Sequence, residues 1–191
     1  MLVQDAFTSE VFCRQFCEWL SGQTLLFGWK ATKESPGAFW HRNYVLTRDF
    51  KNHYDPNAIQ NELTFQRLME ESHPLAQVAH SVSTQFFKGQ PLTRVWVNVQ
   101  AFGDEATIHH DFPMIYRGKA RTVIWYPVEK WDADWGGDFV LFDDHREILD
   151  ACVVKPDRVV SFDGSMFHAA RPISRYTPSL RISVAFGLED F

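Results

Sequence analysis

From Pro91 onward the chain is a succession of short β-prone runs separated by turn residues, and this pattern constrains the fold more than any other feature. The runs are rich in β-branched and aromatic residues, and Gly, Pro, Asp and Ser stand between them. We expect strands at Thr93–Phe102, Thr107–Phe112, Arg121–Val128, Asp138–Phe142, Ala151–Lys155, Arg158–Phe162, Met166–Ile173 and Leu180–Gly187. About eight short strands of this kind are typical of a sandwich or barrel.

The final run shows the two-residue period of a strand with one apolar face. Successive side chains of a strand point to opposite faces. One face therefore carries Leu180, Ile182, Val184 and Phe186, and the other carries Arg181, Ser183 and Ala185.

The N-terminal half has helical patterns instead. Thr8 or Ser9 can cap a helix that runs to about Leu20, and further helices are expected from Ile59 to about Glu71 and from Pro74 to about Phe87. Between them, Thr24–Trp29 suits a short strand and Lys30–Gly37 a loop. The predicted fold is a mainly β, double-stranded β-helix (jelly roll) with N-terminal helices packed on one face. We expect a single domain over residues 1–191, with a helical layer at about 1–90 and a jelly-roll core at about 91–188.

Composition and charge exclude several classes of protein. Of the 191 residues, 45% are hydrophobic and 23% charged, which is typical of a folded globular chain. The net charge of −5 argues against nucleic acid as a partner, because phosphate binding needs a basic face. No apolar run reaches the roughly 20 residues that span a bilayer, and the first ten residues do not resemble a signal peptide. With three cysteines and no disulfide framework, we expect a cytoplasmic protein; the sequence does not predict its oligomeric state.

The motif with most chemical content is His109-x-Asp111, followed far downstream by His168 at the start of another predicted strand. Residues i and i+2 of a strand share a face, so His109 and Asp111 can point at one position while His110 faces away. Two imidazoles and one carboxylate form the facial triad of non-haem Fe(II) oxygenases, which leaves coordination positions open. The alternative for His109 is a strand histidine satisfied by hydrogen bonds.

A second pair, Arg181 and Ser183, shares a face of the last predicted strand. A guanidinium can bind a carboxylate through two parallel hydrogen bonds, and a hydroxyl adds another contact. The alternative is a surface arginine, but both faces of this strand are expected to be covered. The pair therefore indicates a site for an organic acid.

The ordered set His109-x-Asp111, His168 and Arg181-x-Ser183 resembles the signature of the 2-oxoglutarate/Fe(II)-dependent dioxygenases. The segments 124–139 and 168–173 are similar to parts of the prolyl-hydroxylase-like branch of that superfamily. The resemblance covers about Thr93 to Leu188, roughly half of the chain, and residues 1–92 match no family that we can name.

The resemblance implies a set of roles. Iron(II) would be bound by His109, Asp111 and His168, which are also the catalytic residues. The distal carboxylate of 2-oxoglutarate would be bound by Arg181 with Ser183 and Tyr126, and Asn98 and Gln100 would contact the co-substrate. A tyrosine is common where this chain has Gln100, so the match is weaker there. The implied reaction converts 2-oxoglutarate and O2 to succinate and CO2 while the substrate is oxidised, most simply by hydroxylation.

Residues for the substrate side are less constrained by the sequence. Trp40, His41 and Arg42 follow the Lys30–Gly37 loop and are candidates for a substrate lid, with a core tryptophan as the equal alternative. We expect Trp40–Arg42 to line the opening together with the Glu129–Trp135 loop. Arg171 is a candidate for contact with an anionic substrate, and a salt bridge is its alternative.

Three functions remain open. The first is a dioxygenase that acts on a small molecule, which suits a short chain. The second is the same chemistry on a protein or peptide, such as prolyl hydroxylation. The third, from another class, is a non-catalytic jelly-roll binding protein; an Arg181-x-Ser183 clamp for an oxo acid argues against it.

Overall fold

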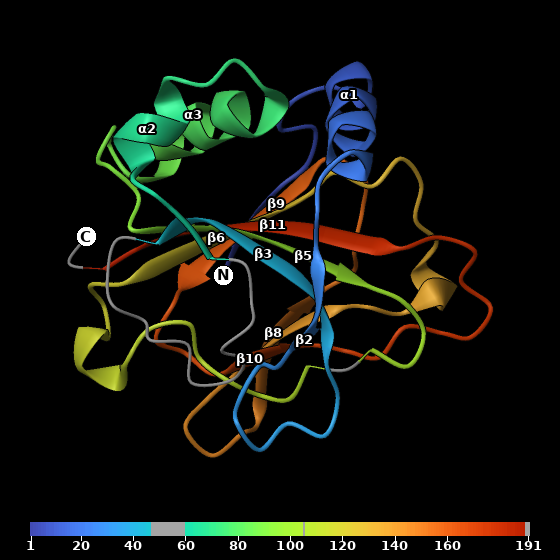
Figure 1. Cartoon of the computed structure of the whole chain (residues 1–191). Helices are drawn as coiled ribbons and strands as arrows, with labels where there is room; N and C mark the ends of the chain where they lie inside the picture. Colours follow the sequence, from blue (N-terminus) through green and yellow to red (C-terminus); the bar gives the residue numbers. More distant parts are fainter. Residues whose placement is uncertain (47–59, 105, 190–191) are drawn as a thin grey trace.

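In the computed structural model, which describes residues 1–46, 60–104 and 106–189, the strands form two β-sheets (Figure 1). The larger sheet has eight strands in the order β1-β9-β6-β11-β5-β3-β2, and β4 pairs with β3. Its strands are β1 (Leu2–Gln4), β2 (Leu26–Trp29), β3 (Phe39–Leu46), β4 (Gln60–Leu63), β5 (Arg94–Gln100), β6 (Arg121–Tyr126), β9 (Arg158–Asp163) and β11 (Arg181–Leu188).

The smaller sheet has the order β10-β7-β8 and packs against one face of the larger sheet. Its strands are β7 (Phe139–Phe142), β8 (Ile148–Cys152) and β10 (His168–Ala170). Phe139 and Leu141 of β7 pack in one apolar cluster with Ile124 and Phe162 of the larger sheet. The predicted mainly β jelly roll is therefore confirmed.

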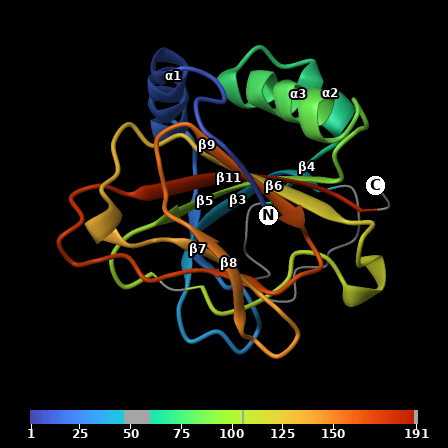
Figure 2. The ribbon, with the colours of Figure 1, turned by 180° about the vertical axis from the view of Figure 1, so that it is seen from behind.

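Three helices cover the opposite face of the larger sheet (Figures 1 and 2). They are α1 (Glu10–Ser21), α2 (Phe65–Met69) and α3 (Pro74–Phe86). Their apolar side chains form one core with the sheet, in which Phe16 packs edge-on to the ring of Trp125 with the ring centroids 4.9 Å apart. None of the helices in the described residues is long and apolar enough to cross a membrane.

The first and last of these helices begin and end close to where the sequence predicts. Ser9 caps α1, because its hydroxyl oxygen accepts a hydrogen bond from the Phe12 amide at 3.1 Å. His73 caps α3 in the same way through Nδ1, and Pro74 occupies the first turn, where its missing N–H costs nothing.

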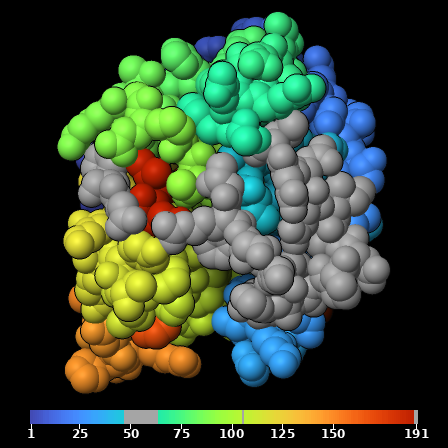
Figure 3. Space-filling model, turned by 60° about the vertical axis from the view of Figure 1, so that its left-hand side comes forward, coloured from blue at the N-terminus to red at the C-terminus, as the bar shows by residue number. Residues whose placement is uncertain are grey.

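Two short 3-10 helices complete the described elements: η1 (Met114–Tyr116) and η2 (Ala133–Trp135). The segment that contains η1 follows directly after Asp111. It protrudes in yellow in Figure 3, below the green helical layer, and exposes Met114 and Ile115.

The middle of the chain differs from the prediction. The helix expected from Ile59 to Glu71 is wrong in its first half, because residues 60–63 form β4, which pairs in parallel with β3. The helix starts only at Phe65, where the Thr64 side chain accepts a hydrogen bond from the Arg67 amide. Ile59 itself lies outside the described residues.

Two strand predictions also need correction. Residues Thr107–Phe112 form no strand; a single bridge joins His109 to His168. The strand expected at Ala151–Lys155 is displaced to Ile148–Cys152. This is an edge strand whose Ile148 and Leu149 are exposed, so its hydrophobic pattern does not mark a buried face.

Trp40–Arg42 belong to β3 and not to a loop. This strand lies inside the larger sheet, between β5 and β2. Because its side chains alternate, Phe39 and His41 are buried while Trp40 is 43% exposed and packs on Phe27.

Candidate metal centre and co-substrate pocket

His109, Asp111 and His168 converge on one position between the two sheets. One ligand atom from each lies within 4.8 Å of the others. Nε2 of His109 is 3.8 Å from Oδ1 of Asp111, and Nε2 of His168 is 3.6 Å from Oδ2. The bridge between His109 and His168, with N···O distances of 3.0 and 2.8 Å, holds the two imidazoles together.

Backbone carbonyls fix the orientation of both imidazole rings. Nδ1 of His109 donates to the Thr107 carbonyl at 2.8 Å, and Nδ1 of His168 donates to the Met166 carbonyl at 3.0 Å. A neutral imidazole whose proton is on Nδ1 has its lone pair on Nε2. Both Nε2 atoms therefore face Asp111 as ligands, which is the arrangement that a divalent transition metal requires.

The Asp111 carboxylate is positioned by its neighbours. Its Oδ2 accepts a hydrogen bond from the Thr122 hydroxyl at 2.8 Å, and its backbone amide donates to the Gly164 carbonyl at 2.9 Å. Burial raises the pKa of Asp111, but the opposing charges of His168, His109 and Arg94 and the Thr122 hydrogen bond outweigh it and hold the pKa below its usual value. The carboxylate is thus kept ionised.

His109 is kept neutral. Burial, with a smaller contribution from the neighbouring His168, lowers the pKa of His109 to about 4, although Asp111 opposes this. Two imidazoles and one carboxylate fit Fe(II), because they leave half of an octahedral coordination sphere for other ligands.

Arg181 lies buried in the same cavity, where its guanidinium contacts four other residues. Nε donates to the Gly137 carbonyl at 2.9 Å, and Nη1 donates to Oε1 of Gln100 at 2.8 Å. Longer contacts of 3.4 and 3.3 Å reach the hydroxyls of Ser183 and Tyr126. A guanidinium has five N–H donors, so these four contacts leave one donor, and the two longer contacts can be exchanged for contacts to a ligand carboxylate.

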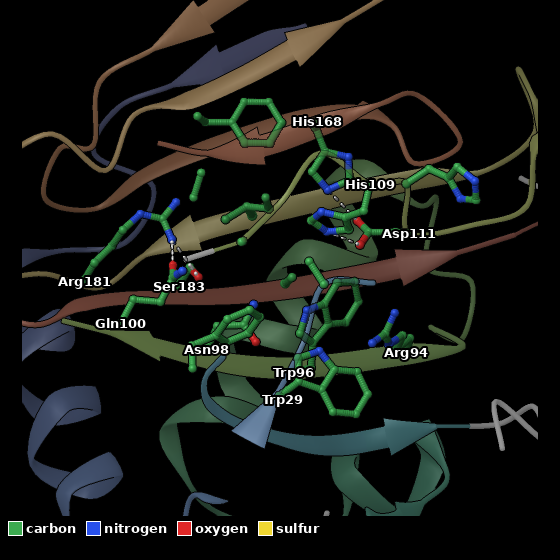
Figure 4. Close-up of a pocket in the computed structure, with 18 of the residues that line it drawn as sticks. Trp29, Arg94, Trp96, Asn98, Gln100, His109, Asp111, His168, Arg181 and Ser183 are labelled. Atoms are coloured by element: carbon green, nitrogen blue, oxygen red, sulfur yellow. Dashed lines mark hydrogen bonds and ion pairs between the residues drawn. The ribbon is translucent and has the colours of Figure 1, made fainter. Parts of the chain in front are cut away.

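A cavity of about 330 Å³ contains both the metal-ligand group and Arg181 (Figure 4). The β5 residues Arg94, Trp96, Asn98 and Gln100 form one wall, and Arg181, Ser183 and Ala185 extend it on the paired strand β11. The predicted alternation of the last strand is therefore confirmed, because Val184 and Phe186 pack in the core on the helical side.

The structure brings the predicted co-substrate residues together. Ser183, Asn98 and Gln100 line the cavity with Arg181. Tyr126 is fully buried behind Arg181, and burial raises the pKa of its hydroxyl to about 12. Asn98 also joins a neighbouring strand, because its Oδ1 is 2.6 Å from Nδ1 of His41.

The predicted substrate residues do not meet at this cavity. Trp40 and Arg42 lie on the other face of β3, where Arg42 contacts Gln23. Arg171 lines an adjoining hollow together with Glu34 and Arg146, and this hollow shares Ala106 and Ala170 with the cavity. The Glu129–Trp135 loop is likewise absent from the described lining.

His110, which was expected to face away, also lines the cavity. Residues 109–111 follow no regular strand beyond the single bridge at His109, so strict alternation does not hold there.

Other lining residues were missed from the sequence. Trp96 and Arg94 continue the alternation of Gln100 and Asn98 backward along β5. The two-residue period of this strand could therefore have placed them on the same face as Gln100 and Asn98. No pattern in the sequence marks Trp29 and Phe39, because they reach the cavity only through the pairing of β2 with β3 and of β3 with β5.

Two histidines and a carboxylate beside an arginine-lined cavity, on a double-stranded β-helix, define a non-haem metal-dependent oxygenase. Residues 95–186 match the family model described as the 2OG-Fe(II) oxygenase superfamily. This stretch, 92 of the 191 residues, is therefore similar to a superfamily whose enzymes use Fe(II) and 2-oxoglutarate, and it contains the three residues that could hold a metal ion.

Solved structures share the fold across the whole chain. A Pseudomonas putida prolyl-4-hydroxylase has a TM-score of 0.61 at 16% identity, covering 100% of this chain and 92% of its own. A Trichoplax adhaerens prolyl hydroxylase, solved with a peptide fragment of hypoxia inducible factor, has a TM-score of 0.66 at 13% identity, covering 99% and 83%.

An α-ketoglutarate-dependent non-haem epimerase from nogalamycin biosynthesis has a TM-score of 0.60 at 12% identity, covering 97% of this chain and 76% of its own. No curated protein matches the sequence. At these identities the likeness establishes the fold, including that of the prolyl-hydroxylase-like branch, and leaves the substrate open.

Proposed function

We propose that this protein is an Fe(II)- and 2-oxoglutarate-dependent dioxygenase that hydroxylates a small molecule and releases succinate and CO2. The observation that carries the proposal is that the metal-ligand group and the Arg181 clamp line one cavity. A binding protein without redox chemistry would need no such pair of sites.

The roles of the residues follow from their geometry. Nε2 of His109, Nε2 of His168 and the Asp111 carboxylate would hold Fe(II), which with 2-oxoglutarate and O2 supplies the oxidising chemistry. Arg181 would pair with the distal carboxylate of the co-substrate while Gln100 and Gly137 keep its guanidinium in place. Ile124, Phe139 and Ala185 give the cavity part of an apolar lining.

The size of the cavity supports a small substrate. Ligand pockets commonly have volumes of about 300–1,000 Å³. At about 330 Å³, this one has room for the co-substrate and a compact molecule or one side chain. Hydroxylation of a residue in a peptide is therefore the alternative outcome that a substrate screen would test.

The test is to supply the purified protein with Fe(II), 2-oxoglutarate and O2 and to measure succinate. We expect succinate formation that requires all three, at a low rate without substrate and a higher rate with one. Asp111→Ala is the negative control. No O2-dependent succinate from the metal-loaded wild type, in the absence or presence of small-molecule and peptide panels, would refute the proposal.

Arg181→Ala gives a more specific prediction. Loss of one partner of a buried charge pair costs about 3–5 kcal/mol, so 2-oxoglutarate affinity should fall at least about a hundredfold. Metal affinity should stay near that of the wild type, because Arg181 contacts none of the three ligands. Calorimetric titration of the Mn(II)-loaded protein with 2-oxoglutarate would measure this, and an unchanged affinity would assign the co-substrate elsewhere.

A further inference from the structure

The hollow that contains Arg171 is not used by the proposed metal and co-substrate sites. It has a volume of about 680 Å³ and shares Ala106 and Ala170 with the cavity, so the two spaces meet at these residues. Ala170 is the last residue of β10, which begins with the metal-facing His168. Two residues of a strand span roughly 7 Å, so the hollow adjoins the cavity close to the metal-ligand group.

Two arginines from different segments line the hollow. Arg171 follows directly after β10, and Arg146 lies in the turn between β7 and β8. The guanidinium carbon of Arg171 lies 5.6 Å from the centroid of the Phe142 ring, and that of Arg146 lies 5.8 Å from the centroid of the Phe167 ring. Such contacts attract the cation to the ring face and leave the edge of the guanidinium available for in-plane hydrogen bonds.

Both arginine side chains are exposed, and neither guanidinium forms a hydrogen bond or an ion pair with a residue that the structure describes. The salt bridge that was the alternative for Arg171 is therefore not formed within the described chain. Burial raises the pKa of Asp138, and the charge of Arg171 partly offsets this without an ion pair between the two. Glu34 is the one acidic side chain in the described lining, which thus carries two positive charges and one negative charge.

Buried hydroxyl groups fix another wall of the hollow, which Thr32 and Thr107 line. The buried Ser35 hydroxyl accepts a hydrogen bond from the Thr32 amide at 2.9 Å and lies 2.5 Å from the Thr107 hydroxyl. The Thr107 carbonyl accepts the Nδ1 hydrogen of His109. This wall is therefore preformed, and it is joined to the metal-ligand group through Thr107.

We propose that this hollow binds the carboxylate of a small organic acid substrate, and that the uncharged remainder of the acid extends past Ala106 and Ala170 into the cavity. The inference rests on the proposed function and identifies the class of its substrate. Arg146 and Arg171 bind the carboxylate through charge-assisted hydrogen bonds, for which the fork of a guanidinium is suited. The uncharged remainder is then the part that is presented for oxidation.

The experiment uses the protein loaded with Mn(II), which does not start turnover, and with N-oxalylglycine, an unreactive analogue of the co-substrate. Hexanoate, octanoate and 3-phenylpropionate are then titrated by calorimetry, each beside its neutral amide. We expect at least one acid to bind at least about tenfold more tightly than its amide, as for a hydrogen bond to a charged group.

Arg146→Gln and Arg171→Gln should each reduce this preference by about threefold, because two guanidiniums share it, and the double variant should abolish it. Glu34→Gln should strengthen the preference, since it removes the opposing negative charge. The matched control is Arg14→Gln, which removes an exposed arginine from α1, on the other face of the larger sheet, and should leave the preference unchanged. Undiminished N-oxalylglycine affinity shows that each variant is folded.

Equal binding of acids and amides by the wild type would overturn the inference. So would a preference that survives in the double arginine variant, a preference that weakens in Glu34→Gln, or an absence of binding by all three acids. Failure of the wild type to bind Mn(II) and N-oxalylglycine is a different result, because it contradicts the proposed function itself.

Discussion

The metal-facing side chains each have a second polar contact that determines how they point. His109 and His168 donate to backbone carbonyls, and Asp111 accepts from the Thr122 hydroxyl. The Thr122 hydrogen bond takes one of the lone pairs of the Asp111 carboxylate, fixes its orientation and leaves the others for a metal. Groups that orient ligands in this way commonly affect metal affinity by about 10- to 100-fold.

Thr122→Val tests this contact, because valine keeps the shape of threonine and removes the hydroxyl. We expect metal affinity to fall by about tenfold or more, measured by competition with a chelator. Thr177→Val is the matched control, since it removes a half-buried hydroxyl that donates to the Trp135 carbonyl away from the ligands. Equal metal affinities in the two variants would show that Thr122 does not orient Asp111.

At the scale of elements, Phe112 fixes the segment that carries His109 and Asp111. This segment is not part of a sheet, but the fully buried Phe112 ring lies against Gly164 and Gly187. A Cβ on either glycine would come within 2.6 Å of that ring. The two glycines thus make room for Phe112, which holds the backbone next to Asp111.

Gly187→Ala should therefore destabilise the protein by about 1–3 kcal/mol through overpacking. Urea unfolding gives the free energy. The double variant with Phe112→Leu separates the cause: if the clash with the ring is responsible, the two changes together should cost less than their sum. If the losses of unfolding free energy in the two single variants simply add in the double variant, alanine at Gly187 destabilises the strand itself and does not clash with Phe112.

The elements also show what sequence periodicity can predict. β11 was predicted with its faces because alternate residues are apolar along its whole length. α1 was predicted from its cap and its apolar stripe, and α3 from Pro74 at its start. β3 was missed. Burial alternates only from Phe39 to Arg42, and both faces are buried from Asn43 to Leu46, so the run as a whole lacks the pattern of a strand with one apolar face.

The site residues that were predicted are those that the sequence marks by their chemistry. His109, Asp111, His168 and Arg181 have chemistry that marks them in the sequence. Trp29 and Phe39 are ordinary apolar residues that reach the cavity only through tertiary pairing. Arg94 and Trp96 are intermediate, since the alternation of β5 indicates the face on which they lie.

At the scale of the whole molecule, the larger sheet separates a helical core from the cavity, and His41 lies buried at the boundary. Burial, with a smaller contribution from Arg94, lowers the pKa of His41 to about 3. The groups that face it are Arg94, Asn98 and Asn43, and its ring stacks on Trp29 with an interplanar angle of 7°. The folded protein therefore keeps this imidazole neutral in mildly acidic solution.

This buried imidazole makes stability depend on pH. In the unfolded chain a histidine takes up a proton near pH 6.5, while in the folded protein His41 does so only near its lowered pKa of about 3. The unfolded state thus binds more protons between these values, and stability is lost as the pH falls below about 6.5. His41 alone should account for a loss of about 2 kcal/mol between pH 7 and pH 5.

His41→Phe keeps a ring against Trp29 and removes the titratable group. Urea unfolding of metal-free protein at pH 7 and at pH 5 should show a smaller loss of stability for this variant than for the wild type, by about 2 kcal/mol. The comparison cancels the contribution of His109, whose pKa is also lowered by burial. His80→Gln, which removes an exposed histidine from α3, is the control for loss of an imidazole. An equal loss of stability in His41→Phe and the wild type would show that His41 is protonated in the folded protein at pH 5, against the burial and stacking described above.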